Sequence, residues 1–580
     1  MNDKMDDRGE GEKSYVEPLG SDPSEVARSR KDPGNARPHH RIPPWSWPIL
    51  ASAVAWAVLT VAIPPGRQDF PIGDDWAFAH GAIWFAQGQG IHYSRWASMP
   101  QLGQWFFSLP FIMVMGPSHF ALRISTIILS WLGIASFYDL LRREGLPSRL
   151  AAFTSCALAM NPLFFVSQGT YMTDVPALAF GLMALNGYSR AMAQRSLRWL
   201  AVAVVVAVLG GLTRQTLIIV PTVAGLMLLR LPELRLKPIW LLSVIVPVMI
   251  DVATSLWFAH RPDVLPMNPT IHSTEQVAFL LFLAIHLCGL TVLPLCLLQL
   301  RPCSWPVFAM AFAALLFVGF YWFLFGEGLP YGGLFPYCTG MLSPWGTYSG
   351  TLMVGDREVL LTPALRMVIS ILGCLGGAAI LDSAVDALRA KSAPGPLMLF
   401  TILQTVVLVF IPVMYDRYLK VVFPGVACLV AVRRAETNLH WAAGITAVAL
   451  YGLVSVGLVH DWFSWNSARW ALGRQAVAQG IAPTDIEGGF EWNGWFGCAD
   501  PERPLSSPNF GARLHDNSTL ALPFSRVFFP QVTGRFALAF TLPPNSSVVA
   551  SNRYSLWLSS SPKELLFVRY LDPGEPQPEQ

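Results

Sequence analysis

The chain has 580 residues, of which 53% are hydrophobic and only 13% are charged, and its formal net charge is +3. Soluble domains carry about 25% charged residues, so the composition excludes an ordinary soluble protein and indicates a chain that crosses a membrane several times. The small net charge, with no basic run interleaved with aromatics, excludes nucleic acid as a partner. No CxxC pair indicates a zinc or redox site, and we expect neither metal nor cofactor.

The apolar stretches predict the membrane-spanning helices. Residues 1–46 are polar and rich in Pro, Gly and mixed charge, which predicts a disordered N-terminal segment. A span needs about 20 apolar residues, and thirteen stretches approach this length: 47–64, 119–141, 149–167, 174–190, 198–212, 216–231, 239–258, 276–300, 305–326, 362–381, 397–415, 418–432 and 441–460. We therefore predict an all-α polytopic membrane domain over 47–460.

The basic residues predict the orientation of these spans. Arg and Lys recur in every second short loop, for example Arg142 and Arg143 after the second stretch, and such loops stay in the cytoplasm. This rule predicts a cytoplasmic N-terminus and an extracytoplasmic C-terminus. The longest extracytoplasmic segments would be 65–118, 327–361 and 461–580.

The tail 461–580 reads as a small α+β domain on the outer face. A helix-like stretch, Trp465–Gln479, precedes the turn-rich "GGFEWNGWFGC" and the strand-like "RFALAFTL" and "SSVVASNRYSLWL". A disulfide between Cys338 and Cys498 is one alternative and two unpaired thiols the other, because geometry decides such a bond.

Two adjacent carboxylates follow the first span in "FPIGDDWAFAHG". Asp74 and Asp75 precede a stretch typical of a short helix in the membrane interface. One interpretation is that Asp74 caps this helix. The other is a general base, because adjacent acids repel and raise the proton affinity of one of them. Composition and spacing leave both open.

Further ionisable residues fall on the same predicted side of the membrane. Asp174 lies in "SQGTYMTDVPALAF", where it either caps a helix with Pro176 in its first turn or lines a site. Arg214 lies between two spans, where an unpaired charge is costly.

Two more loops on this side carry basic residues. His260 and Arg261 lie in "FAHRPD", and Arg417 and Lys420 lie in "MYDRYLKVVFP" with Asp416. These cations either form local structural pairs or converge on a phosphate, for which Arg is geometrically suited. A carboxylate base together with phosphate-binding cations would fit group transfer from a lipid carrier at the outer face.

The order of these motifs resembles the GT-C membrane glycosyltransferases, most of all the family 39 group of protein O-mannosyltransferases and the lipid A aminoarabinose transferase. The similarity runs from "IGDDWAFAHG" through "ASMPQLGQWFFSLPFIMVMGPSHFALRISTIILSWLGIASFYDLLRREG" to "NPLFFVSQGTYMTDVPALAFGLMALNGYSRA", about residues 47–232, and "YDRYLKVVFPGVACL" resembles a late Arg-Tyr element. It implies a polyprenyl-phosphate sugar donor, inversion at the anomeric carbon, no metal and a location in a bacterial plasma membrane. The acceptor would be a lipid, a glycan or a protein.

The resemblance also implies roles for individual residues. Asp74, or Asp75 beside it, would be the base, Asp174 a second acid lining the site, and Arg214 a ligand of the carrier phosphate. His260, Arg261 and Arg417 would be further donor-binding residues. A transporter or lipid flippase is the alternative function, although such proteins commonly show internal repeats and mid-membrane sites. A polysaccharide polymerase would share the lipid-linked substrate without the early acidic pair.

Overall fold

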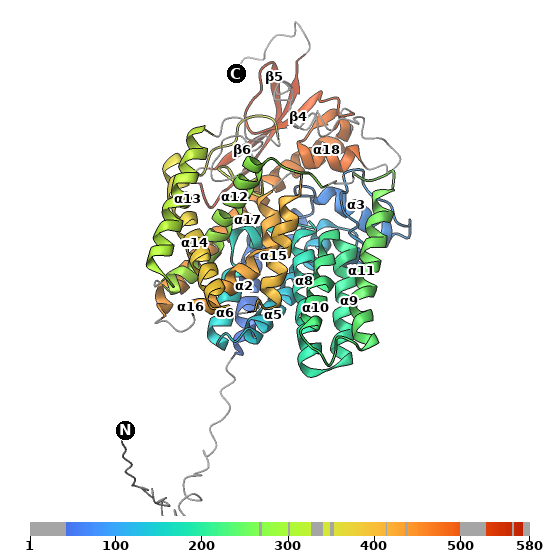
Figure 1. Ribbon diagram of the computed structural model, residues 1–580. Coiled ribbons are helices and arrows are strands. Elements are labelled where there is room, and N and C mark those ends of the chain that lie inside the picture. The colour runs from blue at the N-terminus through green and yellow to red at the C-terminus, as the bar shows by residue number, and fades with distance from the viewer. Residues whose placement is uncertain are drawn as a thin grey trace, which may run out of the picture. The chain divides into compact units, whose positions relative to one another are not determined.

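The computed structural model describes residues 42–265, 269–299, 302–325, 340–348, 353–391, 393–412, 415–434, 439–498, 529, 531–559 and 562–571. Every described helix and strand belongs to the unit Pro44–Gln580. This unit is mostly helical and carries a small sheet in its C-terminal part (Figure 1), which confirms the predicted fold class.

Each of the thirteen predicted stretches contains a helix. The helices are α2 (Trp47–Ala62), α5 (His119–Arg143), α6 (Ser148–Ala159) with α7 (Pro162–Gln168), α8 (Asp174–Gln194), α9 (Leu197–Thr213), α10 (Ile219–Leu229), α11 (Pro238–Ala259), α12 (Thr274–Leu298), α13 (Trp305–Phe325), α14 (Pro363–Arg389), α15 (Pro396–Val409), α16 (Phe423–Arg434) and α17 (Trp441–Ala478). Over the residues that the structure describes, six helices are long and apolar enough to cross a membrane, or seven if α6 and α7 form one bent span. The number of thirteen spans stays a prediction.

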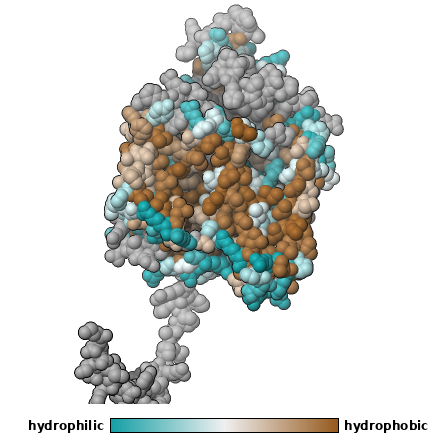
Figure 2. Space-filling model, viewed as in Figure 1, coloured by the Kyte–Doolittle hydropathy of each residue, from teal (hydrophilic) through white to brown (hydrophobic). Residues whose placement is uncertain are grey.

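Large apolar side chains cover the outside of the helical body. Val202 and Val205 of α9 and Ile245 and Met249 of α11 are all exposed. Figure 2 shows hydrophobic residues spread over this face, with hydrophilic residues along its lower end. An apolar surface of this kind marks contact with lipid or a partner, and with the apolar helices it makes the chain a multi-pass membrane protein.

The stretch predicted as one span over 149–167 breaks into α6 and α7, which meet at 66°. The sequence explains the break locally. The Asn161 side chain accepts hydrogen bonds from the amides of Leu163 and Phe164, at 3.0 and 3.1 Å, and Pro162 occupies the first position of α7. Asn is favoured as a helix cap and Pro in the first turn, so α7 starts as a separate helix. Its last turn lies beside the candidate site.

Glycines let α12 and α14 pack backbone against backbone. A Cβ on Gly376 would lie 2.0 Å from the Gly289 carbonyl oxygen. Small residues of this kind are typical of helix interfaces in membranes, where close van der Waals packing drives association.

The segment 65–118 contains η2 (Pro65–Arg67), α3 (Asp75–Ala86) and α4 (Leu102–Met115). Helix α3 is the short helix predicted after the acidic pair. Helix α4 packs against α5 and α9 and had no separate prediction. The short segments η3 (Gln215–Ile218), β1 (Leu342–Ser343), β2 (Gly346–Thr347) and η5 (Asp416–Val421) lie in later connections.

Helix α17 joins the apolar body to the C-terminal part in one continuous run of 38 residues. The predicted boundary at 461 therefore falls inside a helix. The elements that follow are η6 (Pro483–Asp485), β3 (Ile486–Glu487), α18 (Phe490–Gly497), β4 (Phe536–Ala539), β5 (Ser546–Tyr554) and β6 (Lys563–Tyr570). The sheet order is β3-β4-β6-β5, antiparallel except for β3 with β4, and β5 packs along α17.

Candidate active site

The loop before α3 holds the two adjacent carboxylates in different surroundings. Gly73 has φ +60°, which glycine adopts readily, and a Cβ there would lie 2.1 Å from the Tyr348 hydroxyl oxygen. The chain turns at Gly73 and enters α3 at Asp75. The sharp turn separates the environments of Asp74 and Asp75.

Asp75 lies entirely inside the protein. Its Oδ1 accepts a hydrogen bond from the Ile72 amide, and its Oδ2 accepts one from the Tyr171 amide at 3.3 Å. Burial raises the pKa of this carboxyl to about 7, against the opposing effect of the Arg123 charge. Asp75 therefore stabilises the loop from inside the protein through these two backbone hydrogen bonds.

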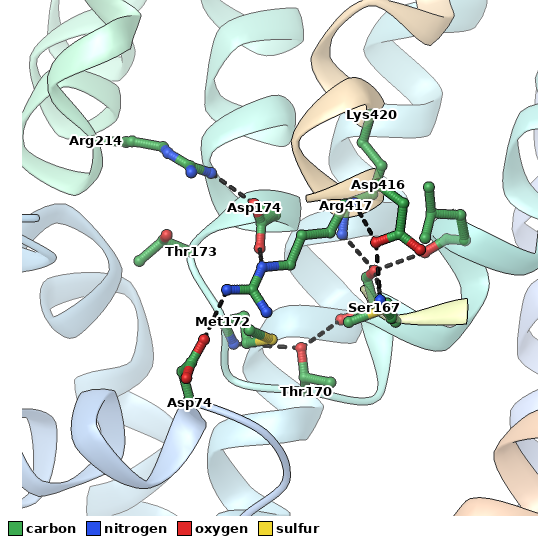
Figure 3. A network of polar contacts seen from close by, with 12 residues as sticks. Asp74, Ser167, Thr170, Met172, Thr173, Asp174, Arg214, Asp416, Arg417 and Lys420 are labelled. Carbon is green, nitrogen blue, oxygen red and sulfur yellow. Dashed lines mark hydrogen bonds and ion pairs between the residues drawn. The ribbon is translucent and has the colours of Figure 1, made fainter. Parts of the chain in front are cut away.

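Asp74 faces the other way and remains 17% exposed. Its Oδ1 accepts a hydrogen bond from Trp96 Nε1 at 3.0 Å, and its Oδ2 lies 2.7 Å from Arg417 Nη2 (Figure 3). Within the described residues, its side chain makes no capping hydrogen bond to α3. Asp74 therefore occupies the N-cap position of α3, as the capping interpretation expects, while its carboxylate pairs with Trp96 and Arg417 instead of the helix amides.

Arg417 connects Asp74 to the second predicted acid. Arg417 Nε lies 3.9 Å from Asp174 Oδ2, and Arg214 Nη1 lies 2.6 Å from Asp174 Oδ1. The side chains of Arg417, Asp174 and Arg214 are 9%, 5% and 11% exposed. Two carboxylates and two guanidinium groups thus form one nearly buried network, drawn in Figure 3, from four distant parts of the chain.

Segment η5, which carries Arg417, is fixed to the rest of the protein by hydrogen bonds of Asp416 and Lys420. Both carboxylate oxygens of Asp416 accept backbone hydrogen bonds, from Met341 at 2.8 Å and Leu342 at 2.9 Å, and Oδ1 also accepts one from the Arg417 amide. Lys420, one turn further, is fully buried and donates a hydrogen bond to the Ser167 hydroxyl at the end of α7.

Two tyrosine rings, Tyr418 of η5 and Tyr415 directly before it, flank the arginines. The guanidinium of Arg214 lies 4.8 Å from the Tyr418 ring centroid, and that of Arg417 lies 4.6 Å from the Tyr415 ring centroid. Cation–π contacts of this kind hold a planar guanidinium in a defined orientation.

His260 and Arg261 lie in a different place. Arg261 pairs with Asp263 at 2.7 Å and stacks on Trp257, while His260 Nδ1 lies 2.7 Å from the Leu256 carbonyl oxygen. Together with His92 these residues line a cavity of about 790 Å³ at the end of α11. The structure does not bring them into the network, so a phosphate role for them stays a prediction.

The sequence pointed to four members of the network, Asp74, Asp174, Arg214 and Arg417. It also placed Lys420 among the cations that either pair locally or converge on a phosphate, and the spacing of three from Arg417 puts both on one side of a helical turn. Trp96 was not predicted, because nothing in its local sequence marks the loop around it as a partner of Asp74.

Two further expectations concern metals and thiols. Over the residues that the structure describes, no three His, Cys, Asp or Glu side chains are grouped to hold a metal ion. Cys498 is buried, whereas Cys338 lies outside the described residues, and the disulfide between them stays a prediction.

Residues 98–258 match the family model described as dolichyl-phosphate-mannose-protein mannosyltransferase. The segment includes Asp174, Arg214 and the helices that carry them. The match confirms the resemblance to GT-C membrane glycosyltransferases. The segment 98–258 of this multi-pass membrane protein is thus similar to protein mannosyltransferases of the GT-C class.

Solved structures give a further, weaker likeness. ArnT from Cupriavidus metallidurans bound to undecaprenyl phosphate is 16% identical, with a TM-score of 0.37 over 92% of this chain and 99% of that one. An oligosaccharyltransferase from Archaeoglobus fulgidus is 13% identical, with a TM-score of 0.38 over 85% of this chain and 69% of that one. TM-scores this low carry no argument about substrate. Among curated proteins, none matches the chain.

Proposed function

We propose that the protein transfers a sugar from a polyprenyl-phosphate carrier to an acceptor hydroxyl at the extracytoplasmic face of a bacterial plasma membrane, with inversion. The observation that carries this proposal is the position of Arg417 between Asp74 and Asp174. The proposed base, Asp74, and the proposed phosphate-binding cation, Arg417, lie within one hydrogen-bond length of each other. The family description, which names a dolichyl-phosphate sugar, supports the same class of donor.

Asp74 is the proposed base. The acceptor oxygen attacks the anomeric carbon, the bond from that carbon to the phosphate oxygen breaks, and Asp74 takes the hydroxyl proton. The products are the glycosylated acceptor, a polyprenyl monophosphate and a protonated Asp74 that returns its proton to water. Asp75 is a poor candidate for this role because it is buried and already accepts two backbone hydrogen bonds.

Arg417, Arg214 and Lys420 are the proposed phosphate ligands. The donor phosphodiester carries one negative charge and the departing monophosphate gains a second, so fixed cations stabilise the transition state more than the ground state. A phosphate that binds Arg417 competes with Asp74 for the same guanidinium. Donor binding would therefore release the Asp74 carboxylate from Arg417, so that it is free to accept the proton of the acceptor hydroxyl. Asp174 holds Arg214 and Arg417 in place.

The test is a transfer assay in membrane vesicles with radiolabelled polyprenyl-phosphate sugars and total envelope as acceptor. General-base catalysis contributes about 10²–10⁴-fold, so Asp74→Asn should lower transfer by that factor at normal membrane abundance. Asp69→Asn is the matched control, because Asp69 lies on the same loop and accepts a hydrogen bond from the His119 amide instead. Full transfer by Asp74→Asn would exclude it as the base. Movement of labelled lipid without transfer in the wild type would favour a flippase.

A further inference from the structure

The C-terminal part of the chain reaches the loop that carries Asp74. Helix α18 lies in "GGFEWNGWFGC", a segment to which the sequence assigned no role. Glu491 Oε1 accepts a hydrogen bond from the Gly73 amide at 3.1 Å, across 418 positions of sequence. Its Oε2 lies 2.9 Å from Arg469 Nη1 of α17, and both side chains of this ion pair are 0% exposed.

A second contact from α18 reaches the Asp74 side chain. The Phe490 ring packs edge-on against Trp96, with centroids 5.3 Å apart, and Trp96 donates the hydrogen bond to Asp74 Oδ1. Helix α18 also lies close to Trp76 of α3, since a Cβ on Gly494 would be 2.3 Å from the Trp76 ring. Helix α18 therefore positions Asp74 in two ways, through the backbone amide of Gly73 and through Trp96, the hydrogen-bond partner of the Asp74 side chain.

We propose that Glu491 is a positioning residue that fixes Asp74 through the Gly73 amide, and that this is a function of the C-terminal part of the chain. The inference rests on the proposed role of Asp74 as the base. Gly73 adopts a left-handed conformation directly before Asp74, so a rotation of its peptide displaces the Asp74 Cα. A buried amide requires an acceptor, and Glu491 provides it while Arg469 balances the charge.

The ion pair must be removed as a pair, because a single substitution leaves a buried charge without a partner. Glu491→Met/Arg469→Met removes the acceptor for the Gly73 amide. Glu491→Gln/Arg469→Gln keeps an acceptor oxygen and removes the charges. A displacement of about 1 Å can cost about 100-fold in rate, so we expect kcat of the Met pair to be about 100-fold below that of the Gln pair. The donor KM should be equal in both, because Arg214 and Arg417 are untouched.

If neither double variant folds, two conservative single variants on α18 test the same inference through the contact between Phe490 and Trp96. Phe490→Leu removes the ring that packs on Trp96. Phe496→Leu removes one that packs on Trp470 and Trp492 instead. We expect a lower kcat for Phe490→Leu alone, with the donor KM unchanged.

Two results separate this inference from the proposed function. If Asp74→Asn abolishes transfer while the Met and Gln double variants have equal kcat, the positioning role is overturned and the proposed base remains. If neither double variant folds, equal kcat for Phe490→Leu and Phe496→Leu overturns the positioning role in the same way. If Asp74→Asn retains full transfer, the proposed base fails, and with it the inference.

Discussion

The buried carboxyl of Asp75 predicts a pH-dependent stability that one substitution should remove. Burial raises its pKa from 3.8 to about 7. Between these values the native state binds a proton that the unfolded state does not, so the free energy of unfolding falls as the pH rises. At about 1.4 kcal/mol per pKa unit, the loss reaches about 4 kcal/mol above pH 7.

Asp75→Asn replaces the titrating group by an amide of the same shape. The amide oxygen accepts from one of the two backbone amides and its NH₂ group faces the other, a cost of about 1–3 kcal/mol at every pH. Between pH 5 and pH 8 the wild type should lose about 3 kcal/mol more stability than the variant. Asp75→Asn is therefore the less stable protein at pH 5, and the difference narrows or reverses at pH 8.

The measurement is equilibrium unfolding in mixed detergent micelles at pH 5, 6, 7 and 8. Asp69→Asn controls for the loss of one carboxylate on the same loop. Parallel pH profiles for the wild type and Asp75→Asn would refute the reasoning, because they would show that Asp75 does not titrate in this range.

Two further predictions concern the donor site and the helix packing. Arg214→Lys loses the planar fork that faces Asp174, and a charged hydrogen bond is worth about 1.5–3 kcal/mol. The donor KM should rise at least about tenfold in the vesicle assay, and an unchanged KM would remove Arg214 from the phosphate site. Gly376→Ala should lower the Tm through a cost of about 1–3 kcal/mol, because its Cβ would meet the Gly289 carbonyl oxygen. Gly66→Ala, with nothing within 4 Å, should leave the Tm unchanged, and equal melting of both variants would contradict the packing argument.

Hydropathy predicted the helices well because it is a local property. Each apolar stretch, from 47–64 to 441–460, contains a helix in the structure. The break at Asn161 was not predicted from hydropathy, which does not change there, although Asn-Pro is a local signal for a new helix. The continuity of α17 past residue 460 was not predicted either, because polarity increases there while the backbone stays helical.

The candidate site was partly predictable for a different reason. The topology puts the ends of several helices at one face, which already gathers Asp74, Asp174, Arg214 and Arg417 on one side. Individual pairs were not predictable, because an ion pair leaves no periodic signal in the sequence. Arg417 and Asp74 are 343 positions apart.

The distances along the chain also determine when the site can form. At synthesis rates of about 5–20 residues per second, Glu491 emerges roughly 20–80 s after Gly73. Until Arg417 emerges the Asp74 loop has neither its arginine nor its glutamate partner, and until Glu491 emerges it still lacks the glutamate. Contacts this distant form late because chain closure must come first. A nascent or truncated chain would thus hold its apolar helices in the bilayer without an assembled centre. Transfer would begin only when the last helices have docked.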